Sequence, residues 1–533
     1  MRLSLPCVAL ALTTAALSQS NAIPGTDISV YDVVTPVVCG RTGPAWPNGT
    51  AGVSIGHSMA NCGSVHVPWY GQQNGVMVDP YPKIAFLLAR ESGGRMVQIS
   101  GKSFMKHSRI AFNFSGGSPC GPCQSGPSQT FRIGCFDIYS AGFNGSRTNL
   151  GPTTEVDPWL GTWDPLGSYF DIGDPAQANY PAPADSVQSL DPTGFDQVKN
   201  RMEVPEIELS ASGNFYGQNQ VVVIGEPVAN RGNNLVSANM DFWWDGTQWN
   251  AVGGSAVQAG SVLNRWNGAT TSMGQNGNDD GRFLVAVKVT GPVDGMWHYE
   301  YAVHNIDNHR GGASLRIPVC ATARVENLGF RDIDQDPLDD WSMTRNGGSI
   351  DFLASASNPL DWNTFYNFYF DSDAAPVAGD VSIDQARLGP GALSVDVATT
   401  VPGLLGTEHL GAGCGSPAPA IFANGVPSSP NPNYGLDLQA TPSSTVVLVF
   451  SSQAQSAPFG GCTVFVDSAT LLASELVAVD ASGAASYSIP IPPGMTPVDL
   501  TAQAFEVRTG GPLLGFLAAS NGLRIRGAAT GCP

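Results

Sequence analysis

The chain has 533 residues and a formal net charge of −19, and it combines 63 Gly and 40 Pro with a charged share of only 13%. Coiled coils, helical bundles and helical solenoids need charged, straight-chain helix formers, so this composition excludes them. The apolar share of 42% is ordinary for a packed core and argues against disorder. Because an acidic surface repels phosphate backbones, we expect no nucleic-acid partner.

The N-terminus has the pattern of a signal peptide. Met1-Arg2 is a short basic start, residues 3–17 are apolar, and Ser20-Asn21-Ala22 is a small-x-small cleavage site. We expect cleavage after Ala22, so that residues 1–22 are a signal peptide and the mature chain is secreted or held at the cell surface. No later run reaches the roughly 20 apolar residues of a transmembrane helix, so we expect no transmembrane segment.

The remaining sequence predicts three units built of short strands. A Cys-, Gly- and aromatic-rich N-terminal β domain covers residues 23–195, a central β-sandwich domain 196–402, and a C-terminal β-sandwich module 403–533. In the last of these, strand-like runs such as Thr445–Phe450 are separated by turn sequences such as Asp480–Gly483. Strands at this spacing, with few short helices, predict a mainly β protein made of several antiparallel β-sandwich-like units.

Several motifs resemble those of uncharacterised secreted proteins of planctomycete bacteria. In the N-terminal part they are Ser103–His107, the Cys120/Cys123 pair and the stretch from Gly134 to Tyr139. The run Gly411-Ala412-Gly413-Cys414-Gly415-Ser416 resembles a C-terminal module found on many exported planctomycete proteins. The resemblance implies an exported, multidomain, β-rich protein, and the family brings no known reaction, cofactor or catalytic residue.

The cysteines predict disulfides, because exported proteins usually oxidise theirs. The disulfide candidates are Cys39, Cys62, Cys120, Cys123, Cys135, Cys414 and Cys462. We expect Cys414 to pair with Cys462, with Cys532 as a competing partner, and Cys320 to be the leftover thiol of an odd set. A tetrahedral zinc site formed by His107 with Cys120, Cys123 and Cys135 is the alternative.

The run Asp332–Asp340 is a candidate calcium loop, because it places carboxylates at alternate positions, as loops that wrap a hard cation do. The candidate ligands are Asp332, Asp334, Asp336, Asp339 and Asp340. Pro337 replaces the Gly of an EF-hand loop and Met343 replaces its closing Glu, so the EF-hand form is excluded. Calcium is therefore a candidate cofactor at this loop, and a solvated Asp-rich turn is the alternative interpretation.

A second metal hypothesis concerns the predicted strand Trp297–His304. Period 2 places His298, Glu300 and His304 on one face of this strand and the aromatic residues on the other. Two imidazoles and a carboxylate could ligate a transition metal. A solvated His/Glu face opposite a packed aromatic face is the simpler alternative.

An acidic and aromatic stretch of the first unit is a candidate sugar site, because aromatic faces stack on pyranose rings while carboxylates bind hydroxyls or transfer protons. The catalytic candidates are Glu155, Asp157, Asp164 and Asp171. Glycosidase catalysis needs two carboxyls roughly 5–10 Å apart across a cleft, which no spacing within one loop guarantees.

The leading hypothesis is an exported, noncatalytic cell-surface or extracellular protein whose C-terminal module attaches or assembles it, because no nucleophile, base or metal set has the sequence context that its chemistry needs. The expected partners are cell-surface components or polysaccharide. One alternative is a secreted glycan-binding or glycan-hydrolysing protein that uses the acidic, aromatic loop. The other is a metal-binding β-barrel or sandwich protein.

Overall fold

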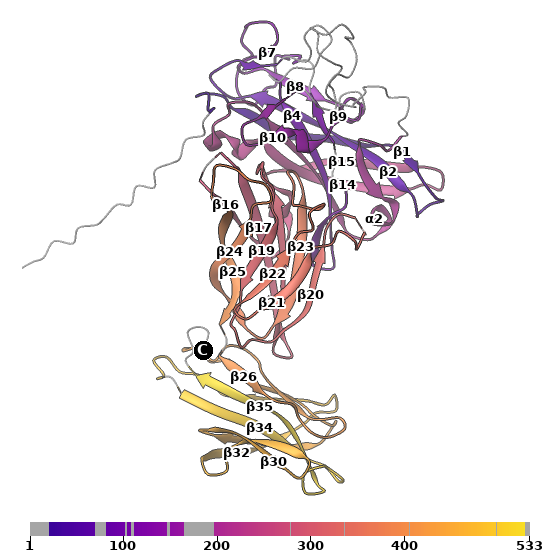
Figure 1. Ribbon diagram of the computed structural model, residues 1–533. Helices are drawn as coiled ribbons and strands as arrows, with labels where there is room; N and C mark the ends of the chain where they lie inside the picture. Colours follow the sequence, from indigo (N-terminus) through magenta and orange to yellow (C-terminus); the bar gives the residue numbers. More distant parts are fainter. Residues whose placement is uncertain are drawn as a thin grey trace, which may run out of the picture.

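The protein is built almost entirely of antiparallel sheets (Figure 1), which confirms the predicted fold class. The computed structural model describes residues 21–69, 81–101, 104–107, 111–146, 150–164, 197–277, 279–334, 336–404, 406–496 and 498–527. Residues 1–20 of the expected signal peptide lie outside this part of the chain. The sheets form three bodies that follow one another along the chain, which we call the N-terminal body (β1–β15), the middle body (β16–β25) and the C-terminal module (β26–β35).

The N-terminal body consists of two facing sheets and two short strand pairs. The first sheet contains β1 (Ile28–Thr42), β2 (Thr50–Asn61), β8 (Phe136–Tyr139) and β12 (Met202–Pro205). The second contains β4 (Lys83–Ser92), β5 (Arg95–Gln98), β6 (Met105–His107), β9 (Leu150–Gly151), β13 (Asn214–Val222), β14 (Leu235–Trp244) and β15 (Trp249–Ala259). The short pairs are β3 (Val67–Pro68) with β7 (Thr130–Phe131), and β10 (Val156–Asp157) with β11 (Thr162–Trp163). Strands β13 to β15 follow the expected boundary at residue 195 yet pair in this body, so its sheets do not divide there.

The middle body is a sandwich of two five-stranded sheets. One contains β16 (Thr270–Gln275), β17 (Arg282–Val293), β18 (Met296–Asn305), β20 (Val325–Arg331) and β23 (Phe365–Ser372). The other contains β19 (Ser314–Pro318), β21 (Ser342–Asn346), β22 (Ser349–Leu353), β24 (Ala375–Asp384) and β25 (Ser394–Leu404). Phe283, Val285 and Val287 alternate along β17 and all lie in the core between the sheets, as period 2 requires.

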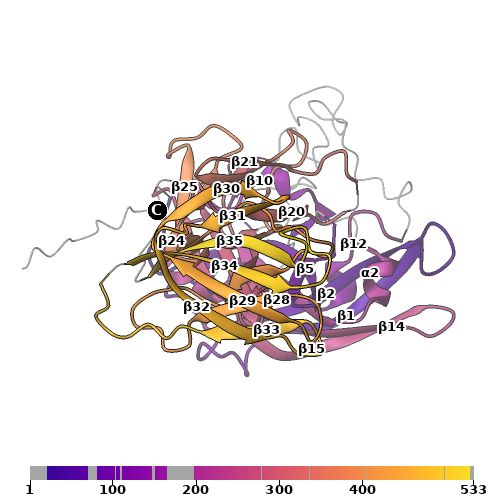
Figure 2. The same cartoon turned by 90° about the horizontal axis from the view of Figure 1, so that it is seen from below.

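The C-terminal module is a smaller sandwich. Its larger sheet has the order β26 (Thr407–Leu410), β35 (Leu517–Gly527), β34 (Val498–Val507), β29 (Thr445–Ser451) and β32 (Leu471–Ala478). The smaller strands are β27 (Ala420–Ala423), β28 (Gly435–Gln439) and β33 (Ala484–Ser488), and the hairpin β30 (Ala454–Phe459) with β31 (Cys462–Val466). Figure 2 shows this module from below, with β32 near the edge of its sheet.

Helices in the described residues are few and short, as expected. They are the α-helices α1 (Ala141–Asn144) and α2 (Glu206–Ser210) and the 3-10 helices η2 (Thr153–Glu155), η4 (Val228–Asn233) and η5 (Val262–Arg265). Helix α2 begins directly after β12 and carries Glu208, which contacts the middle body (see below).

Strand β4 is apolar on both faces, and this joins the first two bodies. Side chains alternate along a strand. Ile84, Phe86 and Leu88 therefore pack into the core of the N-terminal body, while Leu87 and Ala89 pack into a separate core with residues of the middle body. This second core, which we call the shared core, also contains Met96, Tyr216, Leu235, Val262, Leu263, Trp266, Leu284, Ala286, Ala302, Ile306 and Phe365.

Buried side-chain amides complete the same junction. Asn363 donates to the carbonyl oxygen of Phe86 over 2.7 Å, and Asn367 donates to that of Met96 over 2.9 Å. The side-chain oxygen of Gln98 accepts from the backbone N–H of Phe365 over 2.9 Å. Because a buried polar group without a partner is costly, these bonds hold the two bodies in one register.

Candidate functional site

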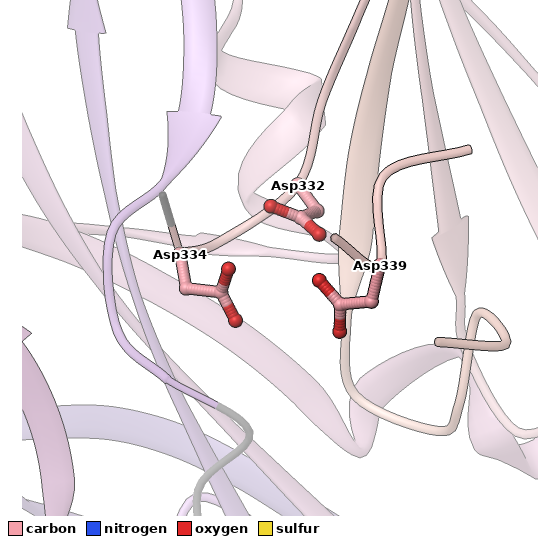
Figure 3. A group of neighbouring side chains, drawn as sticks. All are labelled: Asp332, Asp334 and Asp339. Carbon is pink, nitrogen blue, oxygen red and sulfur yellow. The ribbon is translucent and has the colours of Figure 1, made fainter. Parts of the chain in front are cut away.

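Three of the five predicted calcium ligands lie together in the loop between β20 and β21 (Figure 3). Asp332, Asp334 and Asp339 each place a carboxylate oxygen within 4.8 Å of the others. Asp332 is buried, Asp339 is half-buried and Asp334 is exposed. The alternating carboxylates of the run Asp332–Asp340 thus place Asp332 and Asp334 together, and Asp339, later in the same loop, joins them.

The environment of this acidic cluster is electrostatically unfavourable for three ionised carboxylates. Burial and the charges of the neighbouring aspartates raise the pKa of Asp332 to about 6, against a hydrogen bond from Asn358 that acts in the opposite direction. The Oδ1 atom of Asp339 is buried and has no hydrogen-bond partner among the described residues. A divalent cation would relieve both conditions.

The other two predicted ligands are placed differently. Asp336 is exposed, and its carboxylate accepts from the backbone N–H of Leu338 over 3.0 Å, so it stabilises its own turn. Asp340 is also exposed and does not belong to the group of three. Burial and the charge of Asp339 raise the pKa of Asp340.

The structure separates the histidines of the second metal hypothesis. His298 lies 3.5 Å from Glu300 (Nε2 to Oε2) and 2.7 Å from Asp371 (Nδ1 to Oδ1). His304 lies six residues further along the same strand, about 20 Å away at 3.3 Å per residue. It is fully buried, and its Nδ1 lies 2.8 Å from the hydroxyl of Ser261. One ion therefore has no access to both imidazoles.

Burial also decides the charge of the two histidines. It lowers the pKa of His304 to about 3, so this side chain is neutral at physiological pH. The hydrogen bond with Glu300 raises the pKa of His298, and Asp371 raises it further, against partial burial. His298 is therefore a surface member of an ion-pair network. The simpler interpretation, a solvated His/Glu face, is wrong for the rest of the strand, because Glu300 is 3% and His304 0% exposed.

The acidic and aromatic loop does not form an open sugar platform in its described part. Trp159 and Trp163 are only 3% and 4% exposed. Asp157 lies in β10, and its carboxylate accepts from the backbone N–H groups of Trp159 and Leu160 over 3.0 and 2.9 Å. The rings that would stack on a sugar are thus packed inside the protein, and Asp157 stabilises a turn.

Two further catalytic candidates flank the pair of strands β10 and β11. Glu155 closes the short helix η2 and is half-buried, whereas Asp164 is exposed after β11. Asp171 lies outside the described residues.

Six of the predicted cysteines form three disulfides. They are Cys62–Cys120, Cys123–Cys135 and the expected pair Cys414–Cys462. The zinc alternative is wrong, because its three sulfurs are bonded in disulfides and offer no thiolate ligands. The expectation for Cys320 is also wrong, since Cys320 is disulfide-bonded and buried in the core of the middle body. Cys39 is half-buried in β1 and takes part in none of the three bonds between described cysteines.

The junction of the N-terminal and middle bodies also contains a pocket of about 340 Å³ that no sequence pattern indicated. Its lining includes four basic side chains, Arg90, Arg95, Lys288 and Arg331, together with His298 and Glu300. These residues come from strands β4, β5, β17, β18 and β20. No local motif unites them. The one available signal was the scarcity of Lys and Arg, which makes any cluster of them unusual.

Comparison with known proteins gives little to transfer. No model of a known protein family matches the chain, and no curated protein matches it in sequence. Among solved structures, the chain is similar to a variant of BcpA, the major pilin subunit of Bacillus cereus, at 10% identity and a TM-score of 0.19, over 56% of this chain and 74% of that one. A likeness at this score carries no conclusion about function. Within the described residues, every helix is too short or too polar to cross a membrane.

Proposed function

We propose that the protein is an exported, noncatalytic component of the cell surface or extracellular space, and that its C-terminal module attaches it there. The observation that carries the proposal is the set of three disulfides between described cysteines. Disulfides form and persist in oxidising compartments and are rare in the cytosol. The predicted signal peptide and the resemblance to exported bacterial proteins agree with this compartment.

The outer strand of the C-terminal module supports attachment. Strand β32 lies at the end of its sheet and pairs only with β29 within that sheet. Leu471, Leu472 and Leu476 of this strand are 53%, 57% and 76% exposed, and Glu475 is its one charged residue. An exposed, apolar and sparsely charged edge strand is a template for pairing with another chain. We therefore place the contact with a surface protein at β32, by addition of a strand from the partner.

A fractionation experiment on the full chain tests this attachment. In cells that export the protein, we expect Leu476→Lys to move most of it from the cell-surface fraction to the medium, because a charge at the edge opposes strand addition. Leu388→Lys is the matched control, since Leu388 is 91% exposed in the middle body. Equal surface retention of wild type and Leu476→Lys would refute the role of β32. Wild-type protein found only in the cytoplasm would refute export.

A second function, calcium binding, is supported by the acidic cluster of Asp332, Asp334 and Asp339. Its three convergent carboxylates and the unpartnered Oδ1 of Asp339 give an oxygen-rich site of the kind that calcium uses. We propose that calcium holds the loop between β20 and β21 as a structural clip.

Thermal unfolding with and without calcium tests the clip. We expect calcium to raise the Tm of the wild type, because a ligand that binds only the folded state stabilises it. Asp339→Asn removes this rise, whereas Asp336→Asn, outside the cluster, keeps it. A wild-type Tm that is the same in calcium and in chelator would contradict the proposal.

A further inference from the structure

We propose that the pocket between the N-terminal and middle bodies binds a small polar ligand through a carboxylate, sulfate or phosphate group. Arg90, Arg95, Lys288 and Arg331 all line this pocket, and Glu300 is the one carboxylate among the described residues of its lining. The chain as a whole has 25 Lys and Arg against 44 Asp and Glu. The pocket therefore has the opposite sign of charge from the rest of the molecule.

Two hairpins from different bodies build the pocket, together with Arg331 of β20. Strands β4 and β5 turn at Gly93-Gly94, both with positive φ, and strands β17 and β18 form the facing hairpin. Lys288 lies directly opposite Glu300 in the register of the second hairpin. Because alternate side chains share a face of a strand, each hairpin presents its basic residues together with a neighbouring hydroxyl residue two positions away. The side chains that would bind the ligand thus lie on paired strands and not on loops.

Part of the positive charge is already compensated within the protein. The carboxylate of Glu208 forms ion pairs with Arg90 (Nη2 to Oε2, 2.6 Å) and with Arg331 (Nη2 to Oε1, 2.7 Å). Glu300 forms an ion pair with Arg95 (Nη2 to Oε2, 2.6 Å), and the guanidinium of Arg95 lies 4.0 Å from the centroid of the Tyr369 ring. Four basic side chains thus share two carboxylates, and His298 lies 2.7 Å from Asp371 at the rim. An excess of positive charge remains.

One cation of this pocket has no acceptor among the described residues. Lys288, which is half-buried, forms neither an ion pair with a carboxylate within 4.0 Å nor a hydrogen bond there. Buried or partly buried donors without acceptors are costly, so the pocket favours a guest that supplies oxygen atoms. Arginine forks and a lysine point charge are the groups that recognise carboxylate, sulfate and phosphate.

The size and lining of the pocket restrict the ligand further. Its volume of about 340 Å³ is at the lower end of the roughly 300–1,000 Å³ of small-molecule sites. Val97 is the one large aliphatic side chain of the lining. The ligand is therefore small and polar, in the range from an inorganic oxyanion to an acidic monosaccharide.

Calorimetric titration of the full chain tests the inference and distinguishes the sources of the oxyanion. The probes are sulfate, phosphate, glucuronate and neutral glucose, each in 150 mM NaCl to screen nonspecific attraction. We expect binding of at least one charged probe and none of glucose. A preference for sulfate or phosphate identifies an inorganic oxyanion or its ester, and a preference for glucuronate identifies an acidic sugar.

Variants show whether the pocket is responsible. Lys288→Gln weakens the binding at least tenfold and Lys288→Arg retains most of it, while Arg316→Gln, at an ion pair elsewhere in the middle body, leaves it unchanged. Unaltered circular dichroism and Tm of the variants confirm that they fold. No binding of any charged probe, or equal binding by wild type and Lys288→Gln, would overturn the proposal. Either result is independent of export and of surface attachment.

Discussion

The middle body meets its two neighbours in different ways. Its junction with the N-terminal body contains the shared core and buried amide hydrogen bonds. Its junction with the C-terminal module has a hydrogen bond from exposed Gln439 to Asp294 over 2.6 Å, and no core cluster of described residues crosses it. We therefore expect the first two sandwiches to unfold as one cooperative unit and the C-terminal module to unfold in a separate transition.

Removal of a large side chain from the shared core is the strongest test of this difference. Phe365 is 1% exposed there, so Phe365→Ala lowers the free energy of unfolding by about 3–5 kcal/mol. In calorimetry, we expect the transition of the N-terminal and middle bodies to move to lower temperature together, while that of the C-terminal module stays in place. Separate movement of the first two bodies would show that the shared core does not couple them.

The next test addresses the ion pairs across the first junction. Glu208 is nearly buried between Arg90 and Arg331, so Glu208→Gln costs on the order of 3 kcal/mol. Burial alone would raise the pKa of Glu208, but the two arginines outweigh it and hold the pKa below its usual value. The stabilisation by Glu208 is thus present above the unfolded pKa of about 4.5 and is lost as the pH falls through the lower folded pKa. Urea titrations from pH 7 to pH 3 measure the free energy of unfolding, and we expect the values for wild type and Glu208→Gln to converge as the pH falls. A constant gap between them would exclude this carboxylate as the source.

His298, at the rim of the pocket, is expected to stabilise the protein less than Glu208 does, and with the opposite dependence on pH. The hydrogen bond with Glu300, together with Asp371, raises the pKa of His298. Its contribution to stability is full below the usual histidine pKa and is lost as the pH rises through the raised value. Because the side chain is 42% exposed, we expect less than about 1 kcal/mol. The free energies of unfolding of wild type and His298→Gln between pH 5 and pH 8 measure this contribution. A difference between the two proteins that grows toward pH 8 would contradict a stabilising role of protonated His298.

The second junction should be almost insensitive to substitution. Gln439→Ala removes an exposed hydrogen bond and changes stability by no more than about 0.5 kcal/mol. Neither calorimetric transition is expected to move. A lower Tm of the middle body in this variant would show that the C-terminal module is coupled to it after all.

The sequence predicted what local patterns determine. The β class follows from strand-length runs between turns, and Asp480 and Gly483 form the expected turn, in which the carboxylate accepts from the backbone N–H of Ser482 and Gly483 has a φ of 91°. The pairing of β4 with β13 is not local, because more than a hundred residues separate these strands. A period-2 pattern specifies which face of a strand is apolar, and it contains no information about the partner.

The candidate sites follow the same rule. The acidic cluster was predicted because its ligands are close in the sequence, even though Asp336 faces its own turn. The prediction of a metal site shared by His298 and His304 was wrong, because the two residues lie about 20 Å apart along the same face of the strand. The cationic pocket could not be predicted, since its basic residues extend from Arg90 to Arg331 and meet only when two sheets pack face to face.

The two apolar faces of β4 also determine an order of events during biogenesis. The core on the face that carries Leu87 and Ala89 is complete only when β17, β18 and β23, about 200 to 280 residues later, have formed. Until then the N-terminal half presents part of this apolar layer to solvent, a state prone to association with other chains. We therefore expect the N-terminal half to need the middle body before it is protected from association, whereas the cores of the C-terminal module contain described residues of that module alone.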